Sequence, residues 1–288
     1  MRGLNFIDVY FREGIYGTDT PFVLGAEAAG HVTDVGSGVN GIKVGDRVAY
    51  VTTGGAYAEE RLLDASKAVV LPEGVSNEAA AAIMLKGMTV QYLFKQSYAI
   101  QPGQKCLFHA AAGGVGLLAS QWAKALGAVI VGTVSTKEKA EVARAAGCHY
   151  PVVRSETNFV DVVREVTNGE GCAVVYEAIG KDTMQASLDS LRPMGVCAAY
   201  GHVSGPPDPV DIIQDLGRRG SLFITRPAIM HYVAKRSDLE WTARDLFKAI
   251  GDGILEANIN YEYALKDAVK AHEAIESGKT LGATVLVP

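Results

Sequence analysis

Hydrophobic and polar positions follow two different patterns along this chain. Up to about residue 84 the sequence is rich in glycine and valine, with short alternating stretches such as 30–35 and 47–50. Turn residues at 36–41 and 54–55 separate these stretches. Alternation with a period of two residues is typical of strands that bury one face, so we predict a mainly β region at the start of the chain.

From residue 105 onward, short apolar runs alternate with segments that repeat at helical spacing. The expected strands are 106–110, 129–134, one near 152, 173–176, 196–200 and 221–225. The expected helices are 116–126, 137–146, 159–167, 183–191, 239–250 and 265–276, and a last strand is expected at 283–287. Strands that alternate with helices indicate βαβ units, so we predict an α/β protein with a doubly wound parallel sheet.

Length and composition describe an ordinary globular protein. A chain of 288 residues exceeds a typical single domain, so we expect two domains. Charged residues make up 20% of the sequence, the net charge is −5, and no basic run is long enough to act as a polybasic arm. We therefore do not expect nucleic acid as the main partner.

The cysteines and the apolar runs bear on where the protein works. The four cysteines are far apart and form no CxxC pair or Cys/His cluster, which favours a reducing, cytoplasmic location. The start of the chain has no pattern typical of a secretory signal. No apolar run is long enough to span a bilayer, so we do not expect a membrane protein.

A glycine turn at residues 110–116 follows the first strand of the α/β region and opens a helix. Ala111, Gly113 and Gly116 occupy the three small positions of a GxGxxG pattern, with Gly114 and Val115 between the last two. Such a turn brings the amides of a helix N-terminus close to a dinucleotide pyrophosphate. We therefore predict dinucleotide binding; the alternative is a turn that only packs the helix on the strand.

The end of the second strand predicts which dinucleotide binds. NAD-selective sites usually place an acidic residue there, but this strand is followed by Ser135, Thr136 and Lys137, with Lys139 just beyond. Hydroxyl and ammonium groups can donate charge-assisted hydrogen bonds to a 2′-phosphate, which a carboxylate would repel, so NADPH is favoured over NADH. Glu138 is the counter-evidence, and plain surface solubility is the alternative role for the lysines.

Longer stretches resemble the zinc-independent quinone oxidoreductase and zeta-crystallin family of the medium-chain dehydrogenase/reductase superfamily. They include GLNFIDVYFREGIY at 3–16, LGAEAAGHVTDVGSGV at 24–39, FHAAAGGVGLLASQWAKALGA at 108–128 and LKDAVKAHEAIESGKT at 265–280, with GDRVAY, LKGMTVQYL and GSLFITRP between them. The resemblance implies a mainly β, GroES-like catalytic domain at 1–87 and 258–288 and a Rossmann-type NADPH-binding domain at 88–257. Family members begin with additional β structure, so we expect the GroES-like domain to be incomplete at its N-terminus, with an unpaired edge.

The resemblance also implies that no metal is used. Zinc alcohol dehydrogenases have a cysteine ligand where this chain has Asn5 and a histidine where it has Ala26, beside Glu27. No cysteine stands near Lys86, and His31 is expected to be a polar strand residue, since a zinc site needs three or more protein ligands.

The family pattern assigns site residues to both domains. The expected catalytic residues are Asn5, Tyr10 and Tyr16. The expected NADPH contacts are Asn5, Tyr92, Gly113, Gly114, Val115, Gly116, Ser135, Thr136, Lys139, Arg154, Ile179, Tyr200, Gly201, Phe223, Thr225 and Lys279. Arg154 replaces a tyrosine of the family, and Lys279 stands where some members have arginine. A core or rim role is the alternative for the tyrosines.

The resemblance implies an NADPH:quinone oxidoreductase. A quinone accepts hydride without a Lewis acid, and the nicotinamide supplies the chemistry while the protein aims it, with NADPH expected between the two domains. No histidine and carboxylate pair is identifiable as a general acid. The rival functions are reduction of an enone or alkenal, and a non-catalytic nucleotide- or RNA-binding role. The strand at 221–225 is expected at a sheet edge that pairs with its copy in a homodimer.

Overall fold

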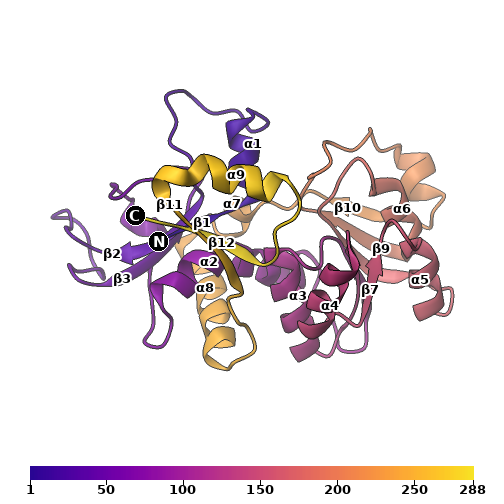
Figure 1. The fold of residues 1–288 in the computed structure, drawn as a ribbon. Helices are drawn as coiled ribbons and strands as arrows, with labels where there is room; N and C mark the ends of the chain where they lie inside the picture. The colour runs from indigo at the N-terminus through magenta and orange to yellow at the C-terminus, as the bar shows by residue number, and fades with distance from the viewer. The chain divides into compact units, whose positions relative to one another are not determined.

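The computed structural model describes residues 1–288, which divide into two compact units. Unit 1 comprises Met1–Thr89 and Ile229–Pro288, and unit 2 comprises Val90–Ala228 (Figure 1). The domains expected from the family pattern differ from these units mainly at residues 229–257, which group with unit 1. The cause lies in helix α8 (Arg236–Gly251), because Arg236 donates hydrogen bonds to the carbonyls of Ser66 and Ala68, both in unit 1.

Unit 1 is built on a six-stranded sheet with the order β11-β12-β1-β2-β3-β4. Its strands are β1 (Arg2–Leu4), β2 (Glu27–His31), β3 (Arg47–Val51), β4 (Ala68–Val70), β11 (Ile259–Ala264) and β12 (Ala283–Val287). Neighbouring strands are antiparallel except β11 and β12, which run parallel. The predicted mainly β region is therefore present, and the last strand has the predicted bounds.

Unit 1 also contains helices: α1 (Phe6–Arg12), α7 (Ile229–Tyr232), α8, α9 (Ala268–Glu276) and most of α2 (Asn77–Tyr92). Two of them, α1 and the first half of α2, lie within the region predicted as mainly β. Every residue from 80 to 92 of α2 is buried, so this part of the helix has no solvent-facing side and no amphipathic period to read. α9 carries Ala271 into a small core with Leu4 and Leu286.

Unit 2 contains a six-stranded, wholly parallel sheet with the order β10-β9-β8-β5-β6-β7. Its strands are β5 (Lys105–Phe108), β6 (Val129–Val134), β7 (Tyr150–Val153), β8 (Cys172–Glu177), β9 (Leu191–Ala199) and β10 (Phe223–Thr225). The helices between them are α3 (Gly114–Ala125), α4 (Lys137–Ala145), α5 (Phe159–Val166) and α6 (Met184–Asp189). The predicted α/β fold with a doubly wound sheet is confirmed.

The strand order reverses between β5 and β8, because β5 continues to β6 on one side and lies beside β8 on the other. In open parallel sheets ligands bind outside the carboxyl ends of the strands at such a switch point. Both strands are buried from Cys106 to Phe108 and from Cys172 to Glu177, which fixes the turns that follow them. The fold therefore points to the turns after β5, β6, β8 and β9 as the place to look for a nucleotide.

Candidate functional site

The glycine turn lies directly after β5, at the switch point. Gly113 is the N-cap of α3 and provides no side-chain hydrogen bond to the helix end. The backbone amides of the first turn, beginning with Gly114 and Val115, are therefore not capped by a side chain and are oriented for an anion. Ala110 adopts the left-handed conformation, with φ of 54°, so the tight bend falls one residue before the first small position of the motif.

Gly116 has a steric reason to be glycine. A Cβ there would lie 2.3 Å from the carbonyl oxygen of Ala110 and 2.6 Å from the Cα of Ala111, which are backbone atoms that cannot move aside. A Cβ on Gly113 would lie 3.3 Å from the same oxygen. The turn thus brings backbone amides close to one point with no side chain in the way, which fits a pyrophosphate.

The residues predicted for the 2′-phosphate follow β6. Ser135 and Thr136 are exposed, and the Thr136 hydroxyl accepts the N–H of Lys139 at 3.3 Å as the N-cap of α4. Lys139 is half-buried, and desolvation lowers the pKa of its ammonium group. Glu138 is exposed in the first turn of α4, as expected.

Arg154 adds a second cation at the same end of the sheet. It follows β7 directly, its side chain is exposed, and its backbone N–H donates to the carbonyl of Val134, the residue before Ser135, at 3.1 Å. The residues that replace the acidic group of an NAD site are therefore hydroxyls and cations, which fits a phosphorylated ribose.

The turns after β8 and β9 converge on Glu177, a residue that sequence reasoning missed. The Glu177 carboxylate accepts the N–H of Ile179 at 2.6 Å and that of Gly180 at 3.1 Å. The Glu177 carbonyl accepts the N–H of Tyr200 at 2.9 Å and that of Gly201 at 3.2 Å. Three predicted cofactor contacts are thus held by one residue, Ile179 through its carboxylate and Tyr200 and Gly201 through its carbonyl. Its only signal in the sequence is an acidic residue at the end of an apolar strand.

The structure also contains a histidine and carboxylate pair that the sequence did not reveal. His109 Nε2 lies 3.3 Å from Oε2 of Glu177, and neither side chain is exposed to solvent. Burial lowers the pKa of His109, while Glu177 acts in the opposite direction. A neutral imidazole closed off from solvent is not placed to act as a general acid, so the pair is structural in this position.

The remaining predicted cofactor residues belong to other elements. Phe223 is exposed and Thr225 half-buried on β10, the edge strand. Tyr92 is buried as the last residue of α2. Lys279 is exposed in the turn after α9 and belongs to unit 1.

The predicted catalytic residues Asn5, Tyr10 and Tyr16 all belong to unit 1. Asn5 is the N-cap of α1, and Tyr10 lies on that helix. The rings of Tyr10 and Tyr16 meet edge to face with centroids 5.6 Å apart, and Phe6 contacts Tyr10 in the same way at 5.5 Å. The structure therefore brings both tyrosines into one aromatic cluster.

A buried ion pair holds the Asn5 side chain. Asn5 Nδ2 donates to Oε1 of Glu27 at 2.8 Å, and Lys86 Nζ donates to the same oxygen at 2.7 Å. The other oxygen of Glu27 accepts the backbone N–H of Leu85 at 2.5 Å. Gly3 leaves the room for this carboxylate, because a Cβ there would lie 2.1 Å from Oε1 of Glu27. The orientation of Asn5 is thus set by a carboxylate and an ammonium group.

Asp8 is a second buried carboxyl beside Asn5. Desolvation raises its pKa to about 7, although the N–H of Asn5 at 3.0 Å acts in the opposite direction. The Tyr57 hydroxyl donates to Asp8 at 3.2 Å and lies 3.0 Å from Nε2 of His272. Oδ1 of Asp8 is buried and has no hydrogen-bond partner, which is the environment of a neutral carboxyl.

The donor set of unit 1 offers little to a metal ion. No group of three or more His, Cys, Asp and Glu side chains that could hold a metal is present in the structure. Asn5 and Ala26 supply neither a thiolate nor an imidazole, and His31 lies exposed at the end of β2.

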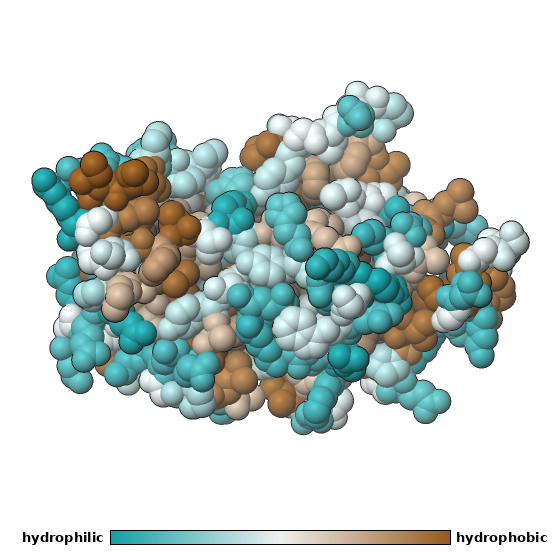
Figure 2. All heavy atoms as spheres, turned by 180° about the vertical axis from the view of Figure 1, so that it is seen from behind, coloured by the Kyte–Doolittle hydropathy of each residue, from teal (hydrophilic) through white to brown (hydrophobic).

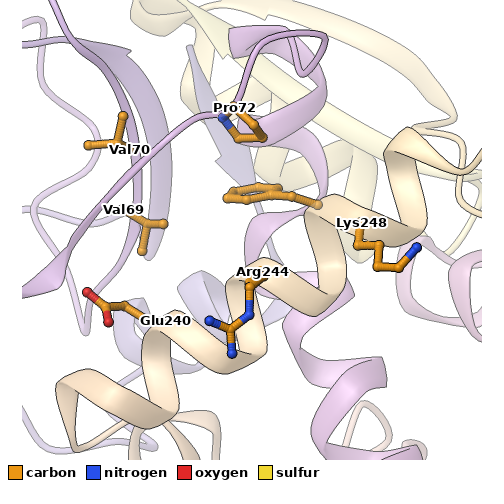
Figure 3. A pocket seen from close by; sticks show the side chains of 7 residues that line it. Val69, Val70, Pro72, Glu240, Arg244 and Lys248 are labelled. Atoms are coloured by element: carbon orange, nitrogen blue, oxygen red, sulfur yellow. The ribbon is translucent and has the colours of Figure 1, made fainter.

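Unit 1 also has a surface pocket. It is lined by Val69, Val70 and Pro72 from the β4 region and by residues of α8, including Glu240, Arg244 and Lys248 (Figure 3). None of the predicted site residues lines this pocket.

No helix of the structure is both long and apolar enough to cross a membrane.

Comparison with known proteins identifies the family. The alcohol dehydrogenase GroES-like domain family matches residues 1–73, and the zinc-binding dehydrogenase family matches residues 114–240. A protein of Burkholderia sp. named 2-haloacrylate reductase is 47% identical over 99% of this chain and 88% of its own length. Quinone oxidoreductase 1 of Escherichia coli K12 is 44% identical over 99% of this chain and 88% of its own length.

Solved structures agree with the sequence relatives. The structure of Escherichia coli quinone oxidoreductase complexed with NADPH matches with a TM-score of 0.97 and 44% identity, covering 100% of this chain and 89% of that one. The structure of 2-haloacrylate reductase matches with a TM-score of 0.90 and 47% identity, covering 100% and 88%. The glycine turn, the α/β sheet and these similarities together show that the chain belongs to the quinone oxidoreductase family of the medium-chain dehydrogenase/reductase superfamily.

Proposed function

We propose that this protein is an NADPH:quinone oxidoreductase that needs no zinc. The observation that carries the proposal is the pair of turns at the carboxyl ends of β5 and β6. One turn presents uncapped amides to a pyrophosphate, and the other presents Ser135, Thr136 and Lys139 to a 2′-phosphate. The 44% identity to a quinone oxidoreductase whose structure holds NADPH supports both the cofactor and the acceptor.

The residues of unit 2 bind and orient the cofactor. The amides of Gly114 and Val115 hold the pyrophosphate, and Lys139 and Arg154 neutralise the 2′-phosphate. Further contacts come from the predicted residues of this unit, namely Tyr92, Ile179, Tyr200, Gly201, Phe223 and Thr225. Lys279, which belongs to unit 1, is proposed as an additional contact. When bound, NADPH supplies the hydride for reduction of the acceptor.

The residues of unit 1 orient the acceptor. Asn5, fixed by Glu27, presents its carboxamide, and Tyr10 and Tyr16 provide an aromatic wall for a planar quinone. One hydride and one proton convert the quinone to a hydroquinone, and the proton comes from water or a tyrosine hydroxyl. We propose accordingly that unit 1 is the catalytic domain and unit 2 the nucleotide-binding domain.

The test is NADPH oxidation measured with a panel of quinones, for the wild type and Lys139→Ala. We expect turnover with quinones and a rise of about tenfold in the Kd for NADPH in the variant, with NADH affinity unchanged. Lys124→Ala is the matched control, because Lys124 is exposed on α3 and is not among the predicted cofactor contacts. An unchanged preference for NADPH in Lys139→Ala would refute the cofactor assignment, and loss of activity with a metal chelator would refute the zinc-free mechanism.

A second candidate is reduction of an electron-poor alkene, such as an enone, alkenal or haloacrylate. The 47% identity to the protein named 2-haloacrylate reductase favours it. Both reactions take hydride to an electrophilic carbon or oxygen conjugated with a carbonyl, so the same site serves either. A ratio of kcat/KM for quinones over alkenes well above one supports the first function, and a ratio well below one supports the second.

We propose in addition a homodimer formed through β10. This edge strand exposes Phe223, and the short helix η3 (Ile212–Gly217) that precedes it in the chain exposes Ile212 and Ile213, with 73% and 64% of their surfaces accessible. Figure 2 shows that hydrophobic residues gather in groups on the face of the molecule seen from behind. Pairing of two copies would satisfy the open strand edge and cover these side chains. Light scattering on the wild type and Phe223→Asp tests it, with a dimer expected only for the wild type.

We propose a cytoplasmic location from the state of the cysteines. Cys106, Cys148, Cys172 and Cys197 are all free and buried, as is common in reducing compartments. Fractionation of cells that express the protein at its natural level is the test.

A further inference from the structure

A fully buried polar cluster joins the two strands at the switch point of unit 2. Its members are His109 after β5, Thr133 on β6, Glu177 at the end of β8, and Thr183 and Ser187 around α6. Glu177 accepts hydrogen bonds from the hydroxyl of Thr183 at 2.9 Å, from the hydroxyl of Ser187 and from the two backbone amides already described. His109 lies 2.8 Å from the hydroxyls of Thr133 and Ser187.

One arrangement of protons satisfies every member of this cluster. The Glu177 carboxylate can only accept hydrogen bonds, so the Ser187 hydroxyl donates to it. The Ser187 oxygen in turn accepts a hydrogen bond from the N–H at His109 Nε2. His109 Nδ1 then accepts the hydroxyl of Thr133. The lowered pKa of His109 agrees with this neutral tautomer. The Glu177 carboxylate is thus compensated by neutral hydrogen-bond donors. A buried carboxylate of this kind is costly unless every donor is in place.

The cluster controls the geometry of one half of the nucleotide site. The β5-β6-β7 half of such a sheet holds the adenosine part of a dinucleotide, and the β8-β9-β10 half holds the other mononucleotide. Glu177 fixes the turn after β8 through its carboxylate and the turn after β9 through its carbonyl. Gly180 has φ of 93° in the first of these turns, and a Cβ there would lie 2.4 Å from the carbonyl of Gly205. These turns therefore have little freedom once Glu177 is in place.

We propose that Glu177 is a positioning residue for the nicotinamide half of NADPH, acting through the amides of Ile179 and Gly180. His109, Thr183 and Ser187 hold its carboxylate in place. This inference rests on the proposed function, because it concerns the same cofactor site. It assigns to a residue that touches no ligand the task of shaping the turns that do.

The experiment compares two ligands that share the adenosine half. NADPH contains both halves, and 2′,5′-ADP contains only the part assigned to the β5 and β6 turns. In Glu177→Met the two amides lose their acceptor, so we expect the Kd for NADPH to rise by about tenfold or more, while that for 2′,5′-ADP changes by less than about twofold. Isothermal titration calorimetry measures both constants without turnover.

Two further variants separate positioning from general destabilisation. Glu177→Gln keeps an amide oxygen for Ile179 and Gly180, and Ser187 can reverse to accept from its NH2 group, so NADPH affinity is expected within about threefold of wild type. Val163→Ala truncates a core residue of unit 2 outside the cluster and should leave both ligands unaffected. If Glu177→Met does not fold, Thr183→Val removes one donor to the carboxylate and is expected to raise only the Kd for NADPH, by about threefold.

The outcomes distinguish this inference from the function on which it rests. Equal losses for NADPH and 2′,5′-ADP, or no loss for either in a folded variant, overturn the positioning role alone. Failure of the wild type to bind NADPH overturns the proposed function and this inference with it.

Discussion

The buried carboxyl of Asp8 makes the stability of unit 1 depend on pH, and Asp8→Asn is expected to remove that dependence. Asp8 is fully buried, has no cation bonded to it, and leaves Oδ1 without a partner. Asparagine has the same shape and is neutral at every pH. The amide oxygen of asparagine can accept from the Asn5 N–H and the Tyr57 hydroxyl, as Oδ2 of Asp8 does.

The magnitude follows from the pKa of Asp8, which burial raises from 3.8 to about 7. Below pH 3.8 the carboxyl is protonated in both the folded and the unfolded state, so it adds no pH dependence to the free energy of unfolding. Between these values the unfolded chain releases the proton while the folded chain keeps it, so the free energy of unfolding falls as pH rises. A difference of roughly three pH units at about 1.4 kcal/mol each corresponds to about 4 kcal/mol. Above about pH 7 both states are ionised, and the loss no longer grows.

The assay is urea denaturation at pH 4 to 8, followed by the fluorescence of Trp241 on α8. Trp122→Phe in all proteins removes the second tryptophan, which lies in unit 2. We expect the free energy of unfolding of Asp8→Asn, minus that of the wild type, to rise by about 4 kcal/mol between pH 4 and 7 and then stay level. His149 and His202, whose pKa values burial lowers, belong to unit 2, titrate in both proteins and cancel in this difference.

Asp19→Asn is the control, because Asp19 is an exposed carboxyl of the same unit. It should show no pH-dependent difference from wild type. A difference between Asp8→Asn and wild type that stays constant within about 1 kcal/mol from pH 4 to 8 would refute the reasoning.

Two further substitutions test the other buried features. Gly116→Ala places a Cβ against the backbone of Ala110 and is expected to destabilise unit 2 by about 1–3 kcal/mol and to weaken NADPH binding, as measured by denaturation and calorimetry. Ala125→Gly, at an exposed position of the same helix, is its control for a simple change in helix propensity. Lys86→Met leaves the Glu27 carboxylate buried without its cation and is expected to cost about 3–5 kcal/mol of unit 1 stability. A loss below about 1 kcal/mol in urea denaturation would contradict the ion-pair argument.

Local patterns in the sequence predicted most of unit 2. The strand at 129–134 is found with the predicted bounds, and the helix predicted at 137–146 ends one residue earlier, because hydrophobic period and turn residues are local properties. The segment 77–92 gave no such signal, since a helix buried on all sides has no polar face. The short helix at 6–12 begins with a capping box from Asn5 to Asp8, a local signal that we overlooked.

The candidate site divides in the same way. Gly113 and Gly116 were recognised because the turn requires small residues at fixed spacing within one segment. The contacts of Glu177 with His109 and Ser187 join separate strands and a helix, and no spacing rule relates such residues. The family pattern supplied Asn5 but not the reason for its orientation, which lies in Glu27 and Lys86.

Each unit therefore contains a buried carboxylate close to residues assigned to chemistry or cofactor binding, and the two are compensated differently. Glu27 has a cation, Lys86, within 2.7 Å, whereas the partners of Glu177 are amides, hydroxyls and a neutral imidazole. An apolar residue of similar volume often stabilises a fold as well as a buried ion pair does, so stability alone does not require either carboxylate. What each carboxylate adds is a fixed orientation of the groups that it hydrogen-bonds. Glu27 fixes the orientation of the Asn5 amide, and the Glu177 carboxylate fixes the backbone turn at Ile179 and Gly180. Both carboxylates therefore act by fixing geometry, as their proposed roles in acceptor and cofactor positioning require.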